Sequence, residues 1–162
     1  MKNLLQLLIP FLLIYGNNCA QAPAQTIPEF EFSRLDESSF TNKDLVHEKM
    51  ILFIFFDSQC EHGQRTVNSI DRQYGSFAKT AIYLVSMDDV QKIRDFINRY
   101  AAHLKDQKSV LLLRDDRSQF ISRFKPYRYP AMLLYSADKK LIDYEDNAES
   151  VFRLVNTISK GK

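Results

Sequence analysis

The chain has 162 residues, of which 45% are hydrophobic and 26% charged, a balance typical of one globular domain. Its net charge is only +2 and its lysines and arginines form no block. This argues against a nucleic-acid partner, because such partners are bound by a clustered basic surface.

The first 24 residues have the composition of an export signal. Lys2 gives a positive start, and residues 4–15 are apolar apart from one glutamine. That run is shorter than the about 20 residues that a membrane-spanning helix needs. Small residues follow, so we expect cleavage after Ala20 or Ala24, which leaves residues 25–162 as the folded domain. The sequence therefore predicts a protein of the periplasm or cell envelope that meets the membrane only through this segment.

Cys19 offers an alternative N-terminus. A cysteine just after an apolar run can be the lipid attachment site of a bacterial lipoprotein, whose signal would here end before Cys19. That site normally follows a small residue, whereas Asn17 and Asn18 precede Cys19, so the residues favour lipidation less. In either case the folded domain has Cys60 as its one thiol, and an odd cysteine in an exported protein suggests a reactive or intermolecular role.

The first half of the domain alternates between strand and helix patterns. Residues 29–35 have the spacing of a strand. Residues 51–56 are consecutive apolar residues, which indicates a strand buried on both faces in the middle of a sheet. We expect a helix to begin at Ser58 or Gln59 and to run to about Tyr74.

The second half continues this alternation of strands and helices. Near the C-terminus a polar turn predicts an antiparallel hairpin. Together the elements predict an α/β fold whose mixed central sheet is flanked by helices on both faces. The expected strands are residues 81–85, 110–113, 132–135 and 141–144, and the expected helices are residues 90–104, 120–124 and 151–158.

Three features of the chain can carry chemistry. Cys60 follows a buried strand and stands at a helix start, where backbone N–H groups and the helix dipole stabilise a thiolate. His62 can add a charge or a hydrogen bond, although a solvent-exposed helix position is the simpler interpretation. Tyr129 and Pro130 stand at the entrance to a strand, where we expect a cis bond. The alternative role for Cys60 is that of a small buried apolar residue.

The order of these features resembles the thioredoxin superfamily, most closely the bacterial periplasmic thiol–disulfide oxidoreductases typified by TlpA and ResA. The resemblance covers about residue 29 to the C-terminus and rests on residues 55–63, Phe-Phe-Asp-Ser-Gln-Cys-Glu-His-Gly, and on Pro130 at the family's cis-proline position. It implies a thioredoxin-like fold in which Cys60 is the nucleophile, His62 tunes its thiolate, and Tyr129 and Pro130 contact the substrate. Gly63 stands where the second cysteine belongs, so Cys60 can attack a disulfide but needs an external thiol for release.

Two functional hypotheses follow. The first is an exported protein that forms mixed disulfides through Cys60 with exported proteins or small thiols, without a metal or another cofactor. The alternative is a redox-inactive module that binds an extended peptide or protein partner in a groove beside Pro130. A one-cysteine peroxidase is not expected. Peroxiredoxins place Thr or Ser three residues before the cysteine and Pro four residues before that, where this chain has Asp57 and Phe53.

Overall fold

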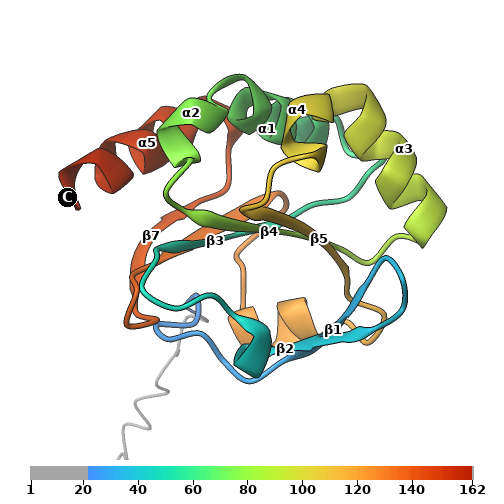
Figure 1. Cartoon of the computed structure of the whole chain (residues 1–162), viewed down its shortest axis with the longest axis horizontal. Coiled ribbons are helices and arrows are strands. Elements are labelled where there is room, and N and C mark those ends of the chain that lie inside the picture. The colour runs from blue at the N-terminus through green and yellow to red at the C-terminus, as the bar shows by residue number, and fades with distance from the viewer. Residues whose placement is uncertain (1–21, 162) are drawn as a thin grey trace, which may run out of the picture.

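The structure, a computed structural model, describes residues 22–161. Nearly all of the predicted export signal, including the alternative lipidation site Cys19, lies outside the described residues. The centre of the described part is one seven-stranded sheet in the order β2-β1-β5-β4-β3-β6-β7 (Figure 1). Its strands are β1 (Glu31–Arg34), β2 (Ser39–Thr41), β3 (Ile51–Phe55), β4 (Ala81–Ser86), β5 (Val110–Arg114), β6 (Ala131–Tyr135) and β7 (Leu141–Glu145).

Five α-helices and three shorter helical segments complete the described part. The α-helices are α1 (Glu61–Arg72), α2 (Tyr74–Phe77), α3 (Val90–Tyr100), α4 (Ala102–Lys105) and α5 (Val151–Lys160). The shorter segments are the 3-10 helices η1 (Asn42–Asp44) and η3 (Ala148–Ser150) and the π-helix η2 (Phe120–Phe124).

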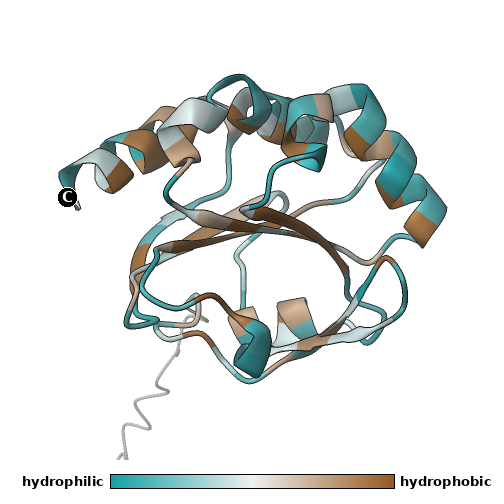
Figure 2. Cartoon of the chain, in the orientation of Figure 1, coloured by the Kyte–Doolittle hydropathy of each residue, from teal (hydrophilic) through white to brown (hydrophobic). Residues whose placement is uncertain are grey.

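The sheet is mixed, as the sequence predicts. Strands β3, β4 and β5 are parallel to one another, whereas β6 is antiparallel to β3 and forms the expected terminal hairpin with β7. Side chains alternate between the two faces of β3. Leu52 and Ile54 contact the α-helical layer and Phe53 and Phe55 the opposite layer, and all four are buried. Figure 2 shows the resulting hydrophobic sheet between two amphipathic layers.

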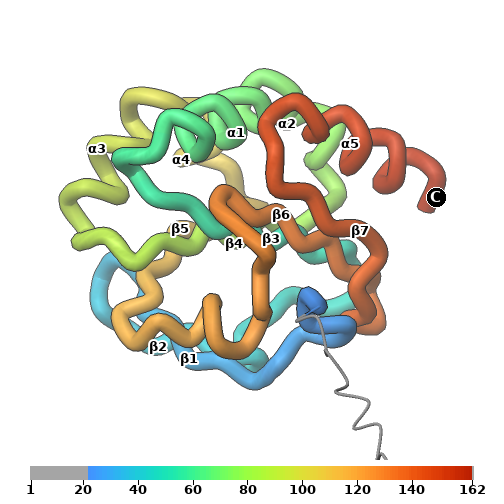
Figure 3. Tube along the Cα trace, turned by 180° about the vertical axis from the view of Figure 1, so that it is seen from behind, coloured from blue at the N-terminus to red at the C-terminus, as the bar shows by residue number. Residues whose placement is uncertain are grey.

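The order of the strands explains where the helices lie. The crossovers from β3 to β4 and from β4 to β5 step in the same direction along the sheet, and right-handed crossovers then place α1 and α3 on the same face. Helices α2, α4 and α5 pack into the same core cluster. The chain leaves β5 beneath the sheet and returns to β6 on the far side of β3 (Figure 3), so η2 covers the other face.

The second face is therefore the aromatic one. The ring of Phe120 stacks on Phe55 with 4.4 Å between centroids, and the ring of Phe124 lies 4.9 Å from Phe53. The prediction of an α/β fold with helices on both faces is confirmed. The two faces are unequal, however, because this one carries only the short segments η1 and η2, the β1–β2 hairpin and the chain before β1.

The predicted helix that begins at Ser58 or Gln59 is wrong in its bounds. The N–H of Ser58 donates to the carboxylate of Asp88 at 2.9 Å, and the N–H of Gln59 donates to that of Asp57 at 2.8 Å. These bonds hold the segment outside the helix, so Cys60 is the N-cap and α1 begins at Glu61. At its other end α1 stops at Arg72, and α2 follows as a separate turn.

Two other predictions need correction. The expected helix 90–104 is two helices, α3 and α4, because the backbone of Ala101 leaves the helical region with φ −150° and ψ 48°. The expected strand 29–35 is shorter, and a second strand, β2, which was not predicted, pairs with it. The phenyl ring of Phe40 in β2 is buried in the aromatic layer.

Candidate active site

Cys60 lies at the end of the sheet where β3 ends. Its backbone is extended, with φ −83° and ψ 120°, and its carbonyl accepts the N–H of Gln64 at 3.0 Å as the first turn of α1 forms. Its side chain is partly exposed and forms no disulfide. A partly exposed thiol at a helix N-terminus has the access that thiol–disulfide exchange requires.

Gly63 lies in the first turn of α1, three residues after Cys60, and is buried. A Cβ added there would lie 3.0 Å from the carbonyl oxygen of Asp57 and 3.7 Å from the Cβ of Phe56. Asp57 has little freedom to retreat, because the same carbonyl accepts the N–H of Cys60 at 3.2 Å. Close packing of α1 against the end of β3 therefore explains this glycine, which helix preference alone does not explain.

A cavity of about 430 Å³ opens beside Cys60. Phe56 forms its buried part, while Met87 and Tyr129 are 41% and 40% exposed and stand at its rim. The carboxylates of Asp57 and Asp88 also line it. The cavity therefore combines apolar walls with two acidic groups next to the one thiol of the described residues.

Asp88 is a site residue that the sequence did not reveal. A single oxygen of its carboxylate accepts the N–H of Ser58 at 2.9 Å and the hydroxyl of Ser86 at 3.0 Å. It thus ties the loop before Cys60 to the end of β4. It is separate from the N-cap of the following helix α3, which is Asp89. The sequence could have indicated Asp88 as a site residue, because the carboxyl ends of adjacent parallel strands meet at one edge of a sheet.

Tyr129 and Pro130 lead into β6 beside the same cavity. The Tyr129–Pro130 peptide bond is cis, Pro130 is buried, and the ring of Tyr129 lies 5.0 Å from that of Phe55. Partial burial raises the pKa of Tyr129, and the nearby carboxylates of Asp115 and Asp57 raise it further. Tyr129 therefore stays a neutral phenol that can donate a hydrogen bond at physiological pH.

His62 is exposed on the first turn of α1. Its Nδ1 lies 4.0 Å from Sγ of Cys60, the outer limit for a hydrogen bond that involves sulfur. The imidazole also lines a second, polar cavity that shares Tyr129 with the first. The structure thus brings Cys60, His62 and Tyr129 to one place, with Pro130 directly behind Tyr129.

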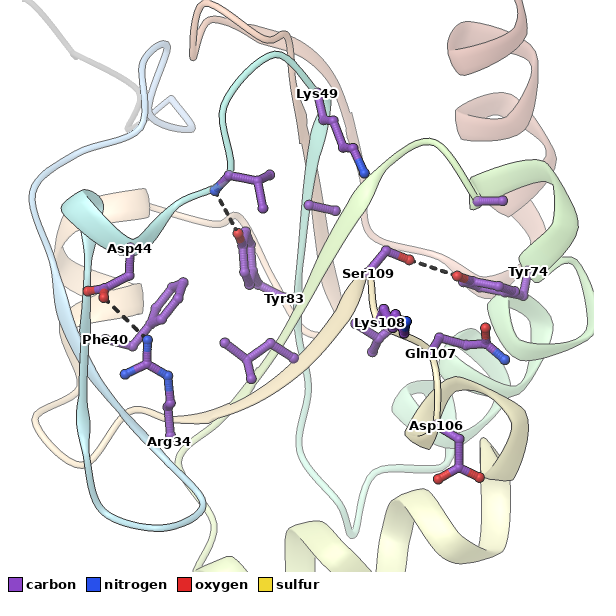
Figure 4. A pocket seen from close by; sticks show the side chains of 15 residues that line it. Arg34, Phe40, Asp44, Lys49, Tyr74, Tyr83, Asp106, Gln107, Lys108 and Ser109 are labelled. Atoms are coloured by element: carbon purple, nitrogen blue, oxygen red, sulfur yellow. Dashed lines mark hydrogen bonds and ion pairs between the residues drawn. The ribbon is translucent and has the colours of Figure 1, made fainter.

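A larger cavity, about 690 Å³, lies at the opposite end of the sheet, where β4 and β5 begin (Figure 4). Tyr83 accepts the N–H of Val46 there at 3.2 Å, and the hydroxyls of Tyr74 and Ser109 are 2.7 Å apart. Cys60 is not among its lining residues. The end of the sheet that carries Cys60 therefore has the smaller cavities.

Residues 22–161 lack two features, a membrane-crossing helix and a cluster of metal ligands. Within this range no helix has the length and apolar character to cross a membrane. The same residues contain no group of three or more His, Cys, Asp or Glu side chains placed to hold a metal ion.

Comparisons with known proteins identify relatives of the chain. The sequence model described as the AhpC/TSA family matches residues 23–144. None of the curated protein sequences matches the chain.

Three solved structures illustrate the structural likeness. Peroxidoxin BcpB from Mycobacterium tuberculosis is 13% identical with a TM-score of 0.71, over 86% of this chain and 97% of that one. A secreted M. tuberculosis disulfide oxidoreductase homologous to E. coli DsbE is 18% identical with a TM-score of 0.64, over 81% and 95%. The thioredoxin domain of a thiol–disulfide oxidoreductase from Bacteroides vulgatus is 20% identical with a TM-score of 0.63, over 83% and 96%. At these identities the likeness establishes a thioredoxin-like fold.

Proposed function

Because the chain belongs to the AhpC/TSA family and has a thioredoxin-like fold, we propose that it is a thiol–disulfide exchange protein that works with one cysteine. The observation that carries this proposal is the placement of Cys60, partly exposed at the N-cap of α1 and on the wall of a cavity. The substrates are disulfides of exported proteins or disulfides formed by small thiols.

The reaction begins when the Cys60 thiolate attacks a disulfide sulfur of the substrate. A bond forms between Sγ of Cys60 and that sulfur, and the other substrate sulfur leaves as a thiolate and takes up a proton. Helix α1 supports the attacking thiolate through its free N–H groups. Gly63 cannot open the resulting mixed disulfide, so an external thiol must complete each turnover.

The test compares attack with turnover. The wild-type protein should be nearly inactive in insulin reduction, yet it should form a mixed disulfide with dithiobis(nitrobenzoate) and release coloured thionitrobenzoate. Cys60→Ser should abolish that adduct. A wild-type protein that forms no such adduct, although Cys60 is partly exposed, would contradict the proposal.

A redox-inactive binding module is the second candidate. The observation in its favour is the apolar rim of the cavity, where Met87 and Tyr129 remain exposed. An extended peptide beside Pro130 would cover both side chains. This candidate predicts that a peptide partner binds Cys60→Ser as tightly as the wild-type protein, whereas a thiol-exchange substrate is trapped only by the wild type.

Export is a further part of the proposal. We propose that residues 1–24 direct the chain to the periplasm or cell envelope, on the basis of Lys2 and the apolar run that follows. Mass spectrometry of protein from its native envelope should find a mature start between Cys19 and Gln25. An intact N-terminus would contradict export by cleavage, and a lipid-modified Cys19 would establish the lipoprotein alternative.

A further inference from the structure

A second cavity shares Tyr129 with the cavity that Cys60 lines. It measures about 370 Å³, and its polar walls come from three separate parts of the chain. His62 and Arg65 project from α1, Arg128 and Tyr129 precede β6, and the remaining walls belong to the connection from β7 to α5. Tyr129 lines both cavities, and His62 lies 4.0 Å from Sγ of Cys60. Cys60 itself is not among the lining residues, so a molecule held here lies beside His62 and Tyr129, the two side chains that connect the cavity to the cysteine.

This cavity carries charges of both signs. Arg128 forms an ion pair with Asp146 at 3.1 Å, and Arg65 pairs with Glu61 at 3.2 Å. Both arginine side chains are more than half exposed, and ion pairs of this kind stabilise a protein little, so a ligand can replace one partner at small cost. Glu149 also lines the cavity and forms no ion pair with another residue of the described range.

The charge pattern selects a class of ligand. The guanidinium of Arg128, the more exposed of the two arginines, suits a carboxylate, which it can bind through two parallel hydrogen bonds. The carboxylates of Asp146 and Glu149 suit an ammonium group. A purely anionic or purely cationic ligand would meet repulsion from one half of this wall, whereas a small zwitterion satisfies both halves.

We infer that this polar cavity binds a small zwitterionic thiol, with the carboxylate and ammonium groups of an amino acid, and that this thiol resolves the mixed disulfide on Cys60. The inference rests on the proposed function, since a protein without a second cysteine needs an external thiol. The bound thiolate attacks Sγ of Cys60, a new disulfide forms between them, and the substrate sulfur leaves as a thiolate that takes up a proton. A second small thiolate then attacks the first, which releases the Cys60 thiolate and a small disulfide.

Binding can be tested without any thiol chemistry. S-methylcysteine keeps both charges and cannot exchange, so it is titrated into the Cys60→Ser protein and followed by backbone amide NMR shifts. Shifts should concentrate at His62, Tyr129 and Asn147. Arg128→Gln should weaken binding by about tenfold, the expected effect of losing one charge-assisted hydrogen bond. Arg72→Gln, an exposed arginine on α1 outside the cavity, is the matched control and should bind like the parent.

The kinetic test uses the thionitrobenzoate adduct of Cys60. Its release is measured with cysteine, with cysteamine, which lacks the carboxylate, and with mercaptopropionate, which lacks the ammonium. Each rate is divided by the rate of the same thiol on a small model disulfide, which removes differences in intrinsic nucleophilicity. Cysteine should exceed the other two by about tenfold. Arg128→Gln should remove most of the preference over cysteamine, and Glu149→Gln most of the preference over mercaptopropionate.

The outcomes separate the two claims. Absence of the thionitrobenzoate adduct overturns the proposed function. Whether the polar cavity binds a zwitterion is then decided by the S-methylcysteine titration alone. An adduct that all three thiols release at equal normalised rates, with no shifts from S-methylcysteine, overturns the zwitterion site and leaves the thiol-exchange function standing. Shifts that persist unchanged in Arg128→Gln and Glu149→Gln likewise overturn it, because the ligand then lies elsewhere.

Discussion

At the scale of single residues, Gly63 is where helix preference and packing oppose each other. Alanine in a helix interior is more favourable than glycine by about 1 kcal/mol. At Gly63 the added Cβ would meet the Asp57 carbonyl at 3.0 Å, whereas at Gly75 in α2 it would meet nothing within 4 Å. The two glycines therefore form a matched pair of sites.

We expect Gly63→Ala to lower the free energy of unfolding by about 1 kcal/mol or more, the cost of forcing an atom into a packed contact. Gly75→Ala should leave it unchanged or raise it by up to about 1 kcal/mol. Urea denaturation of both variants measures the difference. Gly63→Cys carries the same Cβ, so an insulin-reducing variant of normal stability would show that the Asp57 carbonyl yields easily, contrary to the packing argument.

The carboxylate of Asp88 holds the loop before Cys60 in place. Asp88→Ala leaves the N–H of Ser58 and the fully buried hydroxyl of Ser86 without their acceptor. The expected loss is about 1–3 kcal/mol of unfolding free energy, and Asp88→Asn should lose less because its amide oxygen can accept one or both bonds. Chemical denaturation checks this order, with the exposed Asp116→Ala as control. Equal stability of Asp88→Ala and the wild type would refute the role.

At the scale of elements, the break between α3 and α4 shows what periodicity misses. Ile93, Ile97, Tyr100 and Leu104 continue one helical spacing across the break, and the sequence accordingly suggests one helix. The break is stabilised from a distant segment, since the N–H of Leu104 donates to the carboxylate of Asp71 in α1 at 2.9 Å. The other oxygen of that carboxylate lies 2.9 Å from Nδ1 of His103.

Asp71 therefore fastens α4 to α1, and its removal should be costly. Asp71→Ala removes the carboxylate acceptor of the buried N–H of Leu104 and leaves it only the carbonyl of Ala101 at 3.1 Å, with an expected loss of about 1 kcal/mol of unfolding free energy. Asp71→Asn can still accept that bond and should lose less. The control is Asp95→Ala on the exposed face of α3, which removes only the bond from Gln91. Hydrogen exchange should show the amide of Leu104 losing protection in Asp71→Ala alone, and unchanged exchange there would be contrary evidence.

At the scale of the whole molecule, the sequence predicted what local pattern encodes. The consecutive apolar residues 51–56 identified the central strand, and the positions of Cys60 and Pro130 identified the end of the sheet that carries the candidate site. The sequence could not predict contacts between distant segments. One such contact is the bond from Ser58 to Asp88, and another is the cavity between Arg65, Arg128 and Glu149. Both depend on how separate parts of the chain meet, which no spacing in the sequence records.

Tyr135 links the aromatic layer to the stability of the whole domain at alkaline pH. Its side chain is fully buried and its hydroxyl donates to the carbonyl of Ala24 at 3.0 Å. Burial raises the pKa of Tyr135 above the ordinary value of 10.0. Below about pH 10 the phenol is neutral in both states and its contribution is fully present. Above that pH the unfolded chain ionises first, so stability falls as the pH rises toward the folded-state pKa.

Tyr135→Phe should separate these two effects. At pH 8 the variant should be less stable than the wild type by about 1 kcal/mol, because it lacks the bond to Ala24. Above pH 10 the unfolded wild-type chain is stabilised by ionisation of Tyr135, whereas the variant has no phenol at this position. The stability difference between the two proteins should therefore shrink by about 1.4 kcal/mol per pH unit and change sign near pH 11. Tyr127→Phe, at a side chain that is 59% exposed, is the control and should follow the wild-type curve. Urea midpoints from pH 8 to 11.5 measure the difference, and a gap between Tyr135→Phe and the wild type that stays constant over this range would show that burial does not suppress ionisation of this phenol.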